Sequence, residues 1–259
     1  MVALSLGKVA VSIAAPLLFG AGPLLPSREA QTAGLSVPKA ITSFHPLPQE
    51  ELITAYSEAN ARLMEGYFEE ALDRLDLANE INSELPDIWL TRGIIHEKLL
   101  LWDDAVQDYE RARDLSKKRA LFGREDPTII SNIANAETGQ GRWQDALRDF
   151  SKAAEMDKTF MAPKIGKSLV LFQVDKKVQA LATMKEILDQ YPNTFTDGMA
   201  AVAVMEYDLD PEQNRDRSKV LYEEAVKQDA RYADMSWLLE IRRWPPTLVD
   251  AALKLREAI

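Results

Sequence analysis

Only two histidines and no cysteine occur among the 259 residues, so few side chains could serve as nucleophile, general base or soft metal ligand. His96 has no serine, cysteine or second histidine at a spacing that would pair with it. We therefore interpret His96 as a packed, hydrogen-bonded histidine, and His45, which lies in a proline-containing stretch, as exposed and unliganded. The missing cysteines exclude disulfides, thiolate zinc sites and iron–sulfur clusters in this chain.

Acidic pairs are the remaining candidates for acid–base chemistry, and they stand at Glu69-Glu70, Asp103-Asp104 and Glu223-Glu224. Neighbouring side chains on a helix point about 100° apart, so each pair makes a poor dyad. Solvated carboxylates near helix N-termini are the favoured interpretation. The chain has no Gly-rich phosphate loop, no G-x-S-x-G and no H-E-x-x-H. We predict a protein that is not an enzyme and that holds neither a cofactor nor a metal ion.

The charge composition of the chain limits the classes of partner that it can bind. Lys and Arg total 31 against 41 Asp and Glu, which gives a formal net charge of −10. A general nucleic-acid binder needs a basic surface that displaces counterions, so no nucleic-acid partner is expected. Hydrophobic residues make up 46% of the chain and charged residues 28%, which is typical of a globular protein long enough to bury a sizeable core.

The elements that carry these residues follow from an internal repeat. An alanine is followed by a bulky residue four positions later and a small or apolar one after seven. The four sets are Ala71, Leu75, Ala78; Ala105, Tyr109, Ala112; Ala146, Phe150, Ala153; and Ala180, Met184, Ile187. The leading alanines are 34, 41 and 34 residues apart, and the longer interval holds an insertion in KKRALFGRED. On a helix these offsets share one face, and a fixed period of this length indicates stacked units.

These residues resemble the tetratricopeptide repeat (TPR), a 34-residue pair of antiparallel helices. Trp89 and Gly93 also stand at the expected offsets before Ala105. The resemblance implies an all-α fold, a TPR α-solenoid in which helix pairs form a right-handed superhelix, with a C-terminal capping helix. The predicted solenoid spans residues 49–230 and has about four to five repeats, and the capping region spans residues 231–259.

Packing roles follow from the residue types. We expect Leu75, Tyr109, Phe150 and Met184 to fill the layers between repeats, with Gly93 and Ala105 allowing the helices of one pair to approach closely. Asp126-Pro127 and Asp210-Pro211 predict helix starts. The last predicted pair covers residues 195–207 and 211–227. The terminal helix is predicted to have one apolar face, formed by Leu248, Ala251, Ala252 and Leu255. Trp237 and Trp244 are expected to pack against that helix.

Residues 1–34 have the pattern of a targeting segment. No charge stands between Lys8 and Arg28, and the apolar run is interrupted by Pro16 and Gly20. A cleaved export signal is the favoured interpretation, and a retained anchor that associates the protein with a membrane is the alternative. Residues 35–48 contain three prolines and predict an extended linker.

The end of the chain resembles a narrower group. The run ARYADMSWLLEIRRWPP is similar to the C-terminus of TPR proteins of chloroplasts and cyanobacteria, and residues 126–153 resemble their central repeat. The similarity implies residence in the plastid thylakoid, in the lumen or on the membrane. It also implies a scaffold for assembly or stability of a photosynthetic membrane complex. A permanent structural subunit of such a complex and a bacterial periplasmic scaffold remain open.

The first helices of stacked repeats line a concave groove, which commonly holds a peptide or a partner helix. The register places ten residues there: Tyr56, Asn60, Leu90, Thr91, Ile94, Asn132, Asn135, Ile165, Leu169 and Phe172. Asparagine amides can pair with both N–H and C=O of a peptide, so Asn60, Asn132 and Asn135 are the predicted polar contacts with a protein partner. Solvated amides without a partner are the alternative. A polar strip that runs into an apolar patch suits an amphipathic segment.

A site for anions could be a carboxylate clamp or a cluster of basic residues. A carboxylate clamp for chaperone tails needs Lys, Asn, Asn, Lys and Arg, but those places hold Tyr56, Asn60, Thr91, Thr128 and Asn132. All three cations are missing, so this function is not expected. Lys117-Lys118-Arg119 and Arg242-Arg243 are first interpreted as charges at helix C-termini. The alternative is a contact with an acidic partner or an anionic lipid surface.

Overall fold

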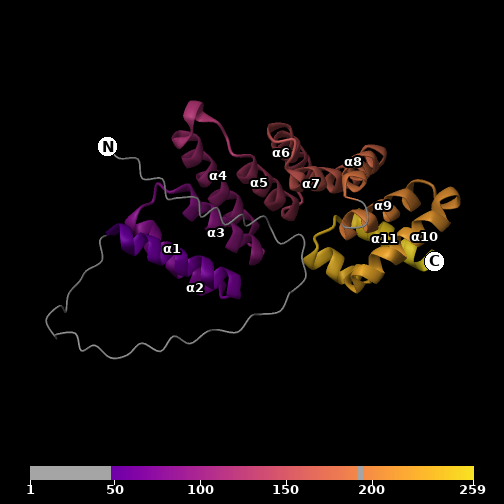
Figure 1. The fold of residues 1–259 in the computed structure, drawn as a ribbon, viewed down its shortest axis with the longest axis horizontal. Coiled ribbons are helices and arrows are strands. Elements are labelled where there is room, and N and C mark those ends of the chain that lie inside the picture. The colour runs from indigo at the N-terminus through magenta and orange to yellow at the C-terminus, as the bar shows by residue number, and fades with distance from the viewer. Residues whose placement is uncertain (1–47, 192–194) are drawn as a thin grey trace, which may run out of the picture. The chain divides into compact units, whose positions relative to one another are not determined.

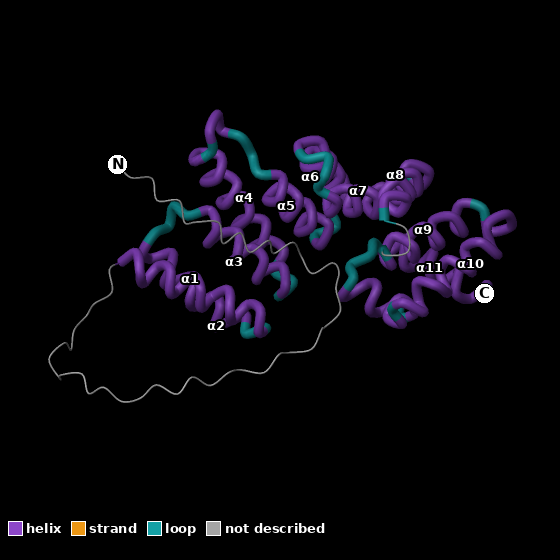
Figure 2. Tube along the Cα trace, viewed as in Figure 1, coloured by secondary structure: helices purple, strands orange, loops and turns teal. Residues whose placement is uncertain are grey.

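The computed structural model describes residues 48–191 and 195–259, and in these ranges its regular structure is helical, with no strand. Figure 2 shows the helices and the loops that join them. The predicted targeting segment, 1–34, and residues 35–47 of the predicted linker lie outside the described residues. Among the described helices, none combines the length and the apolar character needed to cross a bilayer.

Within residues 48–191 and 195–259, five antiparallel helix pairs follow one another (Figure 1). They are α1 (Pro48–Glu65) with α2 (Phe68–Ile81), α3 (Pro86–Lys98) with α4 (Trp102–Arg119), α5 (Pro127–Gly139) with α6 (Trp143–Met156), α7 (Met161–Gln173) with α8 (Lys177–Gln190), and α9 (Thr196–Leu209) with α10 (Pro211–Gln228). The second helix of each of the first four pairs also packs on the first helix of the next. The predicted all-α solenoid of helix pairs is therefore confirmed.

The repeated sets form the inside of this stack. All twelve side chains of the four sets are at most 2% exposed, as are Tyr222 and Ala225 of the fifth pair. Burying a large apolar side chain contributes roughly 1.5–3 kcal/mol, so this periodic face carries much of the stability of the stack. The predicted roles of Leu75, Tyr109, Phe150 and Met184 in the packing layers are confirmed.

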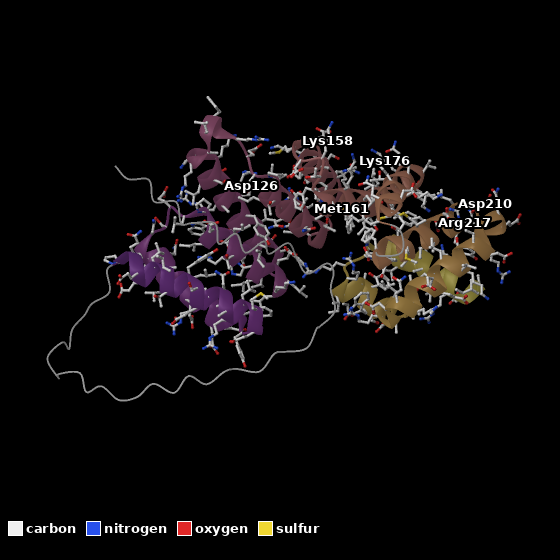
Figure 3. The ribbon with its side chains drawn as sticks, in the orientation of Figure 1. Asp126, Lys158, Met161, Lys176, Asp210 and Arg217 are labelled. Atoms are coloured by element: carbon white, nitrogen blue, oxygen red, sulfur yellow. The ribbon has the colours of Figure 1, made fainter. Side chains whose placement is uncertain are left out.

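Both predicted aspartate–proline helix starts are present, and Figure 3 labels the two aspartates. The Asp126 side chain accepts a hydrogen bond from the Thr128 N–H at 2.7 Å, and Asp210 accepts one from the Gln213 N–H at 3.0 Å. Each aspartate pairs one backbone donor that the first turn leaves free, while the following proline needs no donor there.

The predicted close packing at Gly93 is present, and the side chain that fills the space belongs to Tyr109 on the paired helix α4. A Cβ placed on Gly93 would lie 2.5 Å from the Tyr109 ring, and the three atoms nearest to it all belong to that ring rather than to Ala105. Gly166 of α7 receives the Phe150 ring of α6 in the same way. The bulky middle residue of two repeat sets therefore packs directly against a glycine, which explains why a side chain is missing at both positions.

The chain after α10 first forms the short turn Ala230–Ala233, then the π-helical turn Trp237–Ile241, and finally α11 (Pro246–Ala258). The predicted apolar face of α11 is buried and packs on α9 and also on α7. Trp244 is buried, and Trp237 packs at the edge of the same hydrophobic cluster. The capping helix thus covers the last repeat and extends back over the first helix of the repeat before it.

Candidate partner-binding surface

Tyr56 and Asn60, the predicted groove residues of α1, are partly buried. The Tyr56 hydroxyl lies 3.1 Å from Thr91 Oγ1 on α3, and Asn60 Nδ2 donates to the Tyr56 carbonyl at 2.9 Å. Burial raises the pKa of Tyr56, and the hydrogen bond with Thr91 opposes that shift. These side chains connect the first helices of repeats one and two, and part of the Asn60 amide is already occupied by its own helix.

Asn132 and Asn135 lie on α5 and are partly exposed. Neither side-chain amide has a hydrogen-bond partner in residues 48–191 and 195–259, whereas Asn60 and Asn214 each donate to a backbone carbonyl. A carboxamide offers two donors and an acceptor, so two unpaired amides on one helix can bind the backbone of an extended peptide. These two positions therefore keep the chemistry predicted for them.

Apolar surface lies on the neighbouring first helix. Leu90 and Ile94 of α3 are partly buried and pack against the cluster that contains Tyr109, Ile129 and Ile133. Leu90 also lines a cleft of about 320 Å³ between α3, the end of α4 and the start of α5. The first helices α1, α3 and α5 thus present polar amides and partly exposed apolar side chains together.

Four of the ten predicted groove residues are buried inside the protein, which corrects their expected exposure. Ile165, Leu169 and Phe172 of α7 are 5%, 8% and 1% exposed, and Thr91 of α3 is 2% exposed. The three α7 side chains belong to the same hydrophobic cluster as the buried face of α11, and Thr91 is turned toward Tyr56. The apolar patch predicted in repeat four is therefore covered by the chain itself, because α11 packs on α7.

A C-terminal strap, residues 234–247, is anchored on Asp197 in the first turn of α9. Asp197 is buried, and its Oδ1 accepts hydrogen bonds from Tyr232 at 3.0 Å, Arg242 at 2.7 Å and Trp244 at 3.1 Å. Burial and the negative charge of Asp197 raise the pKa of Tyr232, which keeps its hydroxyl a donor. The strap is held further by Thr247, whose N–H and hydroxyl both donate to the Gln173 side chain of α7.

Between the two strap residues that bind Asp197, Arg243 reaches the second repeat. Arg243 donates to the Glu97 carboxylate at 2.7 Å and to the Glu97 carbonyl at 3.0 Å, and its guanidinium lies 4.6 Å from the centre of the Trp102 ring. Trp102 in turn packs against Gly139 at the end of α5. Arg242 does stand at the C-terminal end of the turn Trp237–Ile241, as predicted, but it and Arg243 also form internal ion pairs that were not predicted from the sequence. In the sequence, the only sign of this contact is that Arg242 and Arg243 are followed directly by Trp244.

His96, the histidine considered as a possible catalytic residue, has a structural role. His96 Nδ1 lies 2.8 Å from Asp108 Oδ2, which confirms the packed, hydrogen-bonded histidine. Arg92 approaches the same carboxylate at 3.3 Å. Burial raises the pKa of Asp108, and the charges of Arg92 and His96 oppose that shift. The region described contains no group of three side chains arranged to hold a metal ion.

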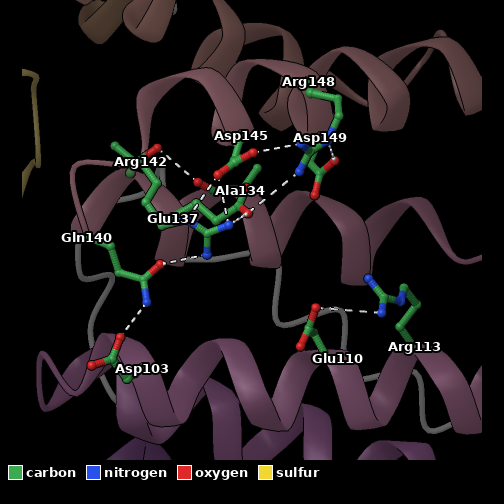
Figure 4. Close-up of polar contacts among 11 residues, drawn as sticks. Asp103, Glu110, Arg113, Ala134, Glu137, Gln140, Arg142, Asp145, Arg148 and Asp149 are labelled. Carbon is green, nitrogen blue, oxygen red and sulfur yellow. Dashed lines mark hydrogen bonds and ion pairs between the residues drawn. The ribbon is translucent and has the colours of Figure 1, made fainter.

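One buried acid on α5 was not singled out by the sequence. Glu137 is 3% exposed, with Arg142 at 3.3 Å and Arg148 at 3.8 Å, and its Oε2 has no hydrogen-bond donor in the described residues. Both arginines bind Asp145 more closely (Figure 4). Burial, followed by the negative charge of Asp149, raises the pKa of Glu137 to about 7, although Arg142 counteracts the shift. Glu137 faces α6, so it belongs to repeat packing.

Comparisons with known proteins agree with this architecture. No protein-family model matches the chain, and no curated protein matches it. YrrB, a TPR protein described as having an unusual peptide-binding site, is a similar solved structure, with a TM-score of 0.54, 16% identity, and coverage of 81% of this chain and 93% of that one. PilF of Pseudomonas aeruginosa has a TM-score of 0.58 and 18% identity, with coverage of 81% of this chain and 92% of PilF. A MamA double mutant has a TM-score of 0.60 and 14% identity, with coverage of 70% of this chain and 98% of MamA. The likeness shows the fold, a TPR-like helical solenoid.

Proposed function

We propose that this protein is a non-catalytic scaffold that binds a protein segment on the surface formed by α1, α3 and α5. The observation that carries the proposal is the pair of unpaired, partly exposed amides at Asn132 and Asn135, next to a helix that presents Leu90 and Ile94. The solenoid fold supports it, since stacked repeats commonly hold peptides on their first helices. The similarity to YrrB, whose description includes a peptide-binding site, supports it too.

The chemistry of this surface favours one kind of segment. Amides bind backbone groups of an extended chain, and the partly exposed leucine and isoleucine accept apolar side chains. An acidic tail is disfavoured because the positions that would hold a carboxylate clamp carry no cation. Because α11 covers α7, the partner contacts the first three repeats rather than the whole row of first helices.

For the cellular role we propose a thylakoid protein that assists assembly or stability of a photosynthetic membrane complex. The support is the resemblance of residues 230–246 to the ending of plastid and cyanobacterial TPR proteins, together with the apolar run before Arg28. A permanent subunit of the complex is the second candidate, and a bacterial periplasmic scaffold is the third. Presence on assembly intermediates alone favours the assembly factor, and stoichiometric abundance in the mature complex favours the subunit.

The test is a quantitative pulldown from detergent-solubilised thylakoid membranes with the full chain and the double variant Asn132→Ala, Asn135→Ala. We expect recovery of the specific partner to fall at least about tenfold, since two hydrogen-bonding groups at roughly 1 kcal/mol or more each are lost. The matched control is Gln107→Ala with Gln144→Ala, which removes two exposed carboxamides from the second helices α4 and α6. If both double variants recovered the partner equally well, the assignment of the binding surface to Asn132 and Asn135 would be refuted.

A further inference from the structure

The insertion between the second and third repeats ends in an exposed apolar tip. It lengthens α4 to Arg119 and is followed by the turn Leu121–Gly123, which Figure 1 shows projecting from the neighbouring helices. Leu121 is 78% exposed and Phe122 is 95% exposed, the largest value among the exposed large hydrophobic side chains of the described residues. Phe122 has a φ of 62°, a left-handed conformation that a bulky residue rarely adopts.

Four cations surround this tip. Lys117, Lys118 and Arg119 form the last turn of α4, Arg124 follows the turn, and all four are exposed. None of the four takes part in an ion pair within the described part of the chain, where most other arginines do. They are therefore free to meet an external anion.

The acids next to the tip are engaged elsewhere. Glu125 forms an ion pair with Lys152 of α6, and the hydrogen bond from Lys152 lowers the pKa of Glu125. Asp126 caps α5 through the Thr128 N–H. These two carboxylates thus stay bound to the third repeat, and the tip presents cations and apolar side chains although the chain as a whole has a net charge of −10.

We propose that this tip, residues 117–124, binds an anionic lipid surface, with Leu121 and Phe122 entering the interface and the four cations meeting the headgroups. Exposed apolar side chains beside Lys and Arg are the combination that holds peripheral proteins on anionic membranes. Two apolar side chains on a turn are too small for a stable protein interface, which buries roughly 800 Å² per partner, so a protein occupant is disfavoured. Membrane contact here is separate from the amide-bearing surface on α5.

The absence of cysteine allows a local test in the full chain. Leu121→Cys, labelled with a polarity-sensitive fluorophore, reports on the tip alone, whatever residues 1–47 contribute to membrane binding. We expect a blue shift with vesicles that contain phosphatidylglycerol and none with pure phosphatidylcholine. The same label at Val220→Cys, an exposed position on α10, is expected to give no shift with either vesicle.

Two further variants identify the groups involved. In the labelled protein, Phe122→Ser and the triple change Lys117→Gln, Lys118→Gln, Arg119→Gln should each raise the lipid concentration for half-maximal shift at least about fivefold. A triple change of three exposed lysines elsewhere, Lys158→Gln, Lys176→Gln and Lys254→Gln, alters the net charge equally and should leave it unchanged. No shift at position 121 with anionic vesicles, a shift only with a soluble acidic peptide, or equal effects of both triple changes would overturn the proposal.

Discussion

The Arg243 Nη1 atom lies 2.7 Å from the Glu97 Oε1 atom, although 146 positions separate the two residues in the chain. Glu97 also accepts a hydrogen bond from the Tyr109 hydroxyl at 2.9 Å, so one carboxylate joins the packing layer of repeat two to the C-terminal strap. Arg243 has a φ of 59°, a conformation that costs energy for a residue with a side chain and that its contacts must compensate.

Replacing Arg243 by alanine should lower the free energy of unfolding by about 1–2 kcal/mol, because a charge-assisted hydrogen bond and a cation–π contact are lost. Hydrogen exchange in residues 234–247 should become faster. Arg231 is the matched control, since it also pairs with a carboxylate, Asp229, and lies over a tryptophan, Trp237, but both partners are within six residues of it in the chain. Arg231→Ala should cost less than about 0.5 kcal/mol; an equal loss in both variants would contradict a special role for Arg243.

Asp197→Asn should be the most damaging conservative change in the strap. It leaves the largely buried Arg242 without its counter-ion, and breaking a buried pair in this way typically costs about 3–5 kcal/mol. Chemical denaturation measures the loss. The control is Asp229→Asn, because Asp229 is only partly buried and its partner Arg231 is exposed; this variant should stay within about 1 kcal/mol of the wild type. A small effect at Asp197 would mean that the strap is not held by this carboxylate.

The raised pKa of Glu137 should make the stability of the folded protein decrease as the pH rises. Its pKa is raised in the folded state, from 4.5 to about 7, so the folded protein holds this proton more tightly than the unfolded chain. The stabilising effect is complete below pH 4.5 and is lost as the pH rises toward 7. Relative to wild type, Glu137→Gln should therefore gain stability between pH 4.5 and pH 8, by at most about 3 kcal/mol at 1.36 kcal/mol per pKa unit.

Chemical unfolding of both proteins at pH 4.5, 6 and 8 measures this difference, and titrations common to both cancel. Asp145→Asn is a comparison on the same network, because hydrogen bonds from Arg142 and Arg148 lower the pKa of Asp145 and its contribution changes only at acidic pH. A constant difference between wild type and Glu137→Gln across this range would show that the acid titrates normally.

Gly93→Ala should destabilise the second repeat by about 1–3 kcal/mol, since a methyl group there meets the fully buried Tyr109 ring and forces it to move. The higher helix propensity of alanine offsets roughly 1 kcal/mol of that cost. Replacing the ring by a smaller side chain, in the double variant Gly93→Ala, Tyr109→Leu, should relieve part of the destabilisation caused by Gly93→Ala. A double-mutant cycle measures this coupling. Additive losses in the cycle would show that the two residues do not compete for the same space.

The repeat could be read from the sequence because its physical cause is local. An alanine with partners four and seven positions later defines one buried helix face, and all four sets, from Ala71 to Ile187, are buried as predicted. Likewise, aspartate before proline marks a helix start through contacts within one turn, as at Asp126 and Asp210. Such features depend on neighbours that are close in the chain.

The strap was not predictable on the same basis. The repeat register assigns the same role to the first helix of every repeat, so we expected Ile165, Leu169 and Phe172 in an open groove. In the structure α11 packs on α7, and these three side chains are buried. Nothing periodic links Arg243 to Glu97, and two adjacent arginines are equally typical of a helix end. For Asn132 and Asn135 the sequence predicted the position and the chemistry, and their role in binding stays a prediction.

In an ordinary linear array each unit touches only its neighbours, so the ends fray independently and stretching is opposed by one interface at a time. The Arg243–Glu97 contact adds a shortcut between the second and the last unit. Pulling the two termini apart would load this shortcut before the intervening interfaces, and melting at the C-terminus would loosen α3 and α4 without passing through α5 to α8. This contact therefore links the second repeat directly to the chain after the fifth repeat, and the first repeat lies outside the linked part.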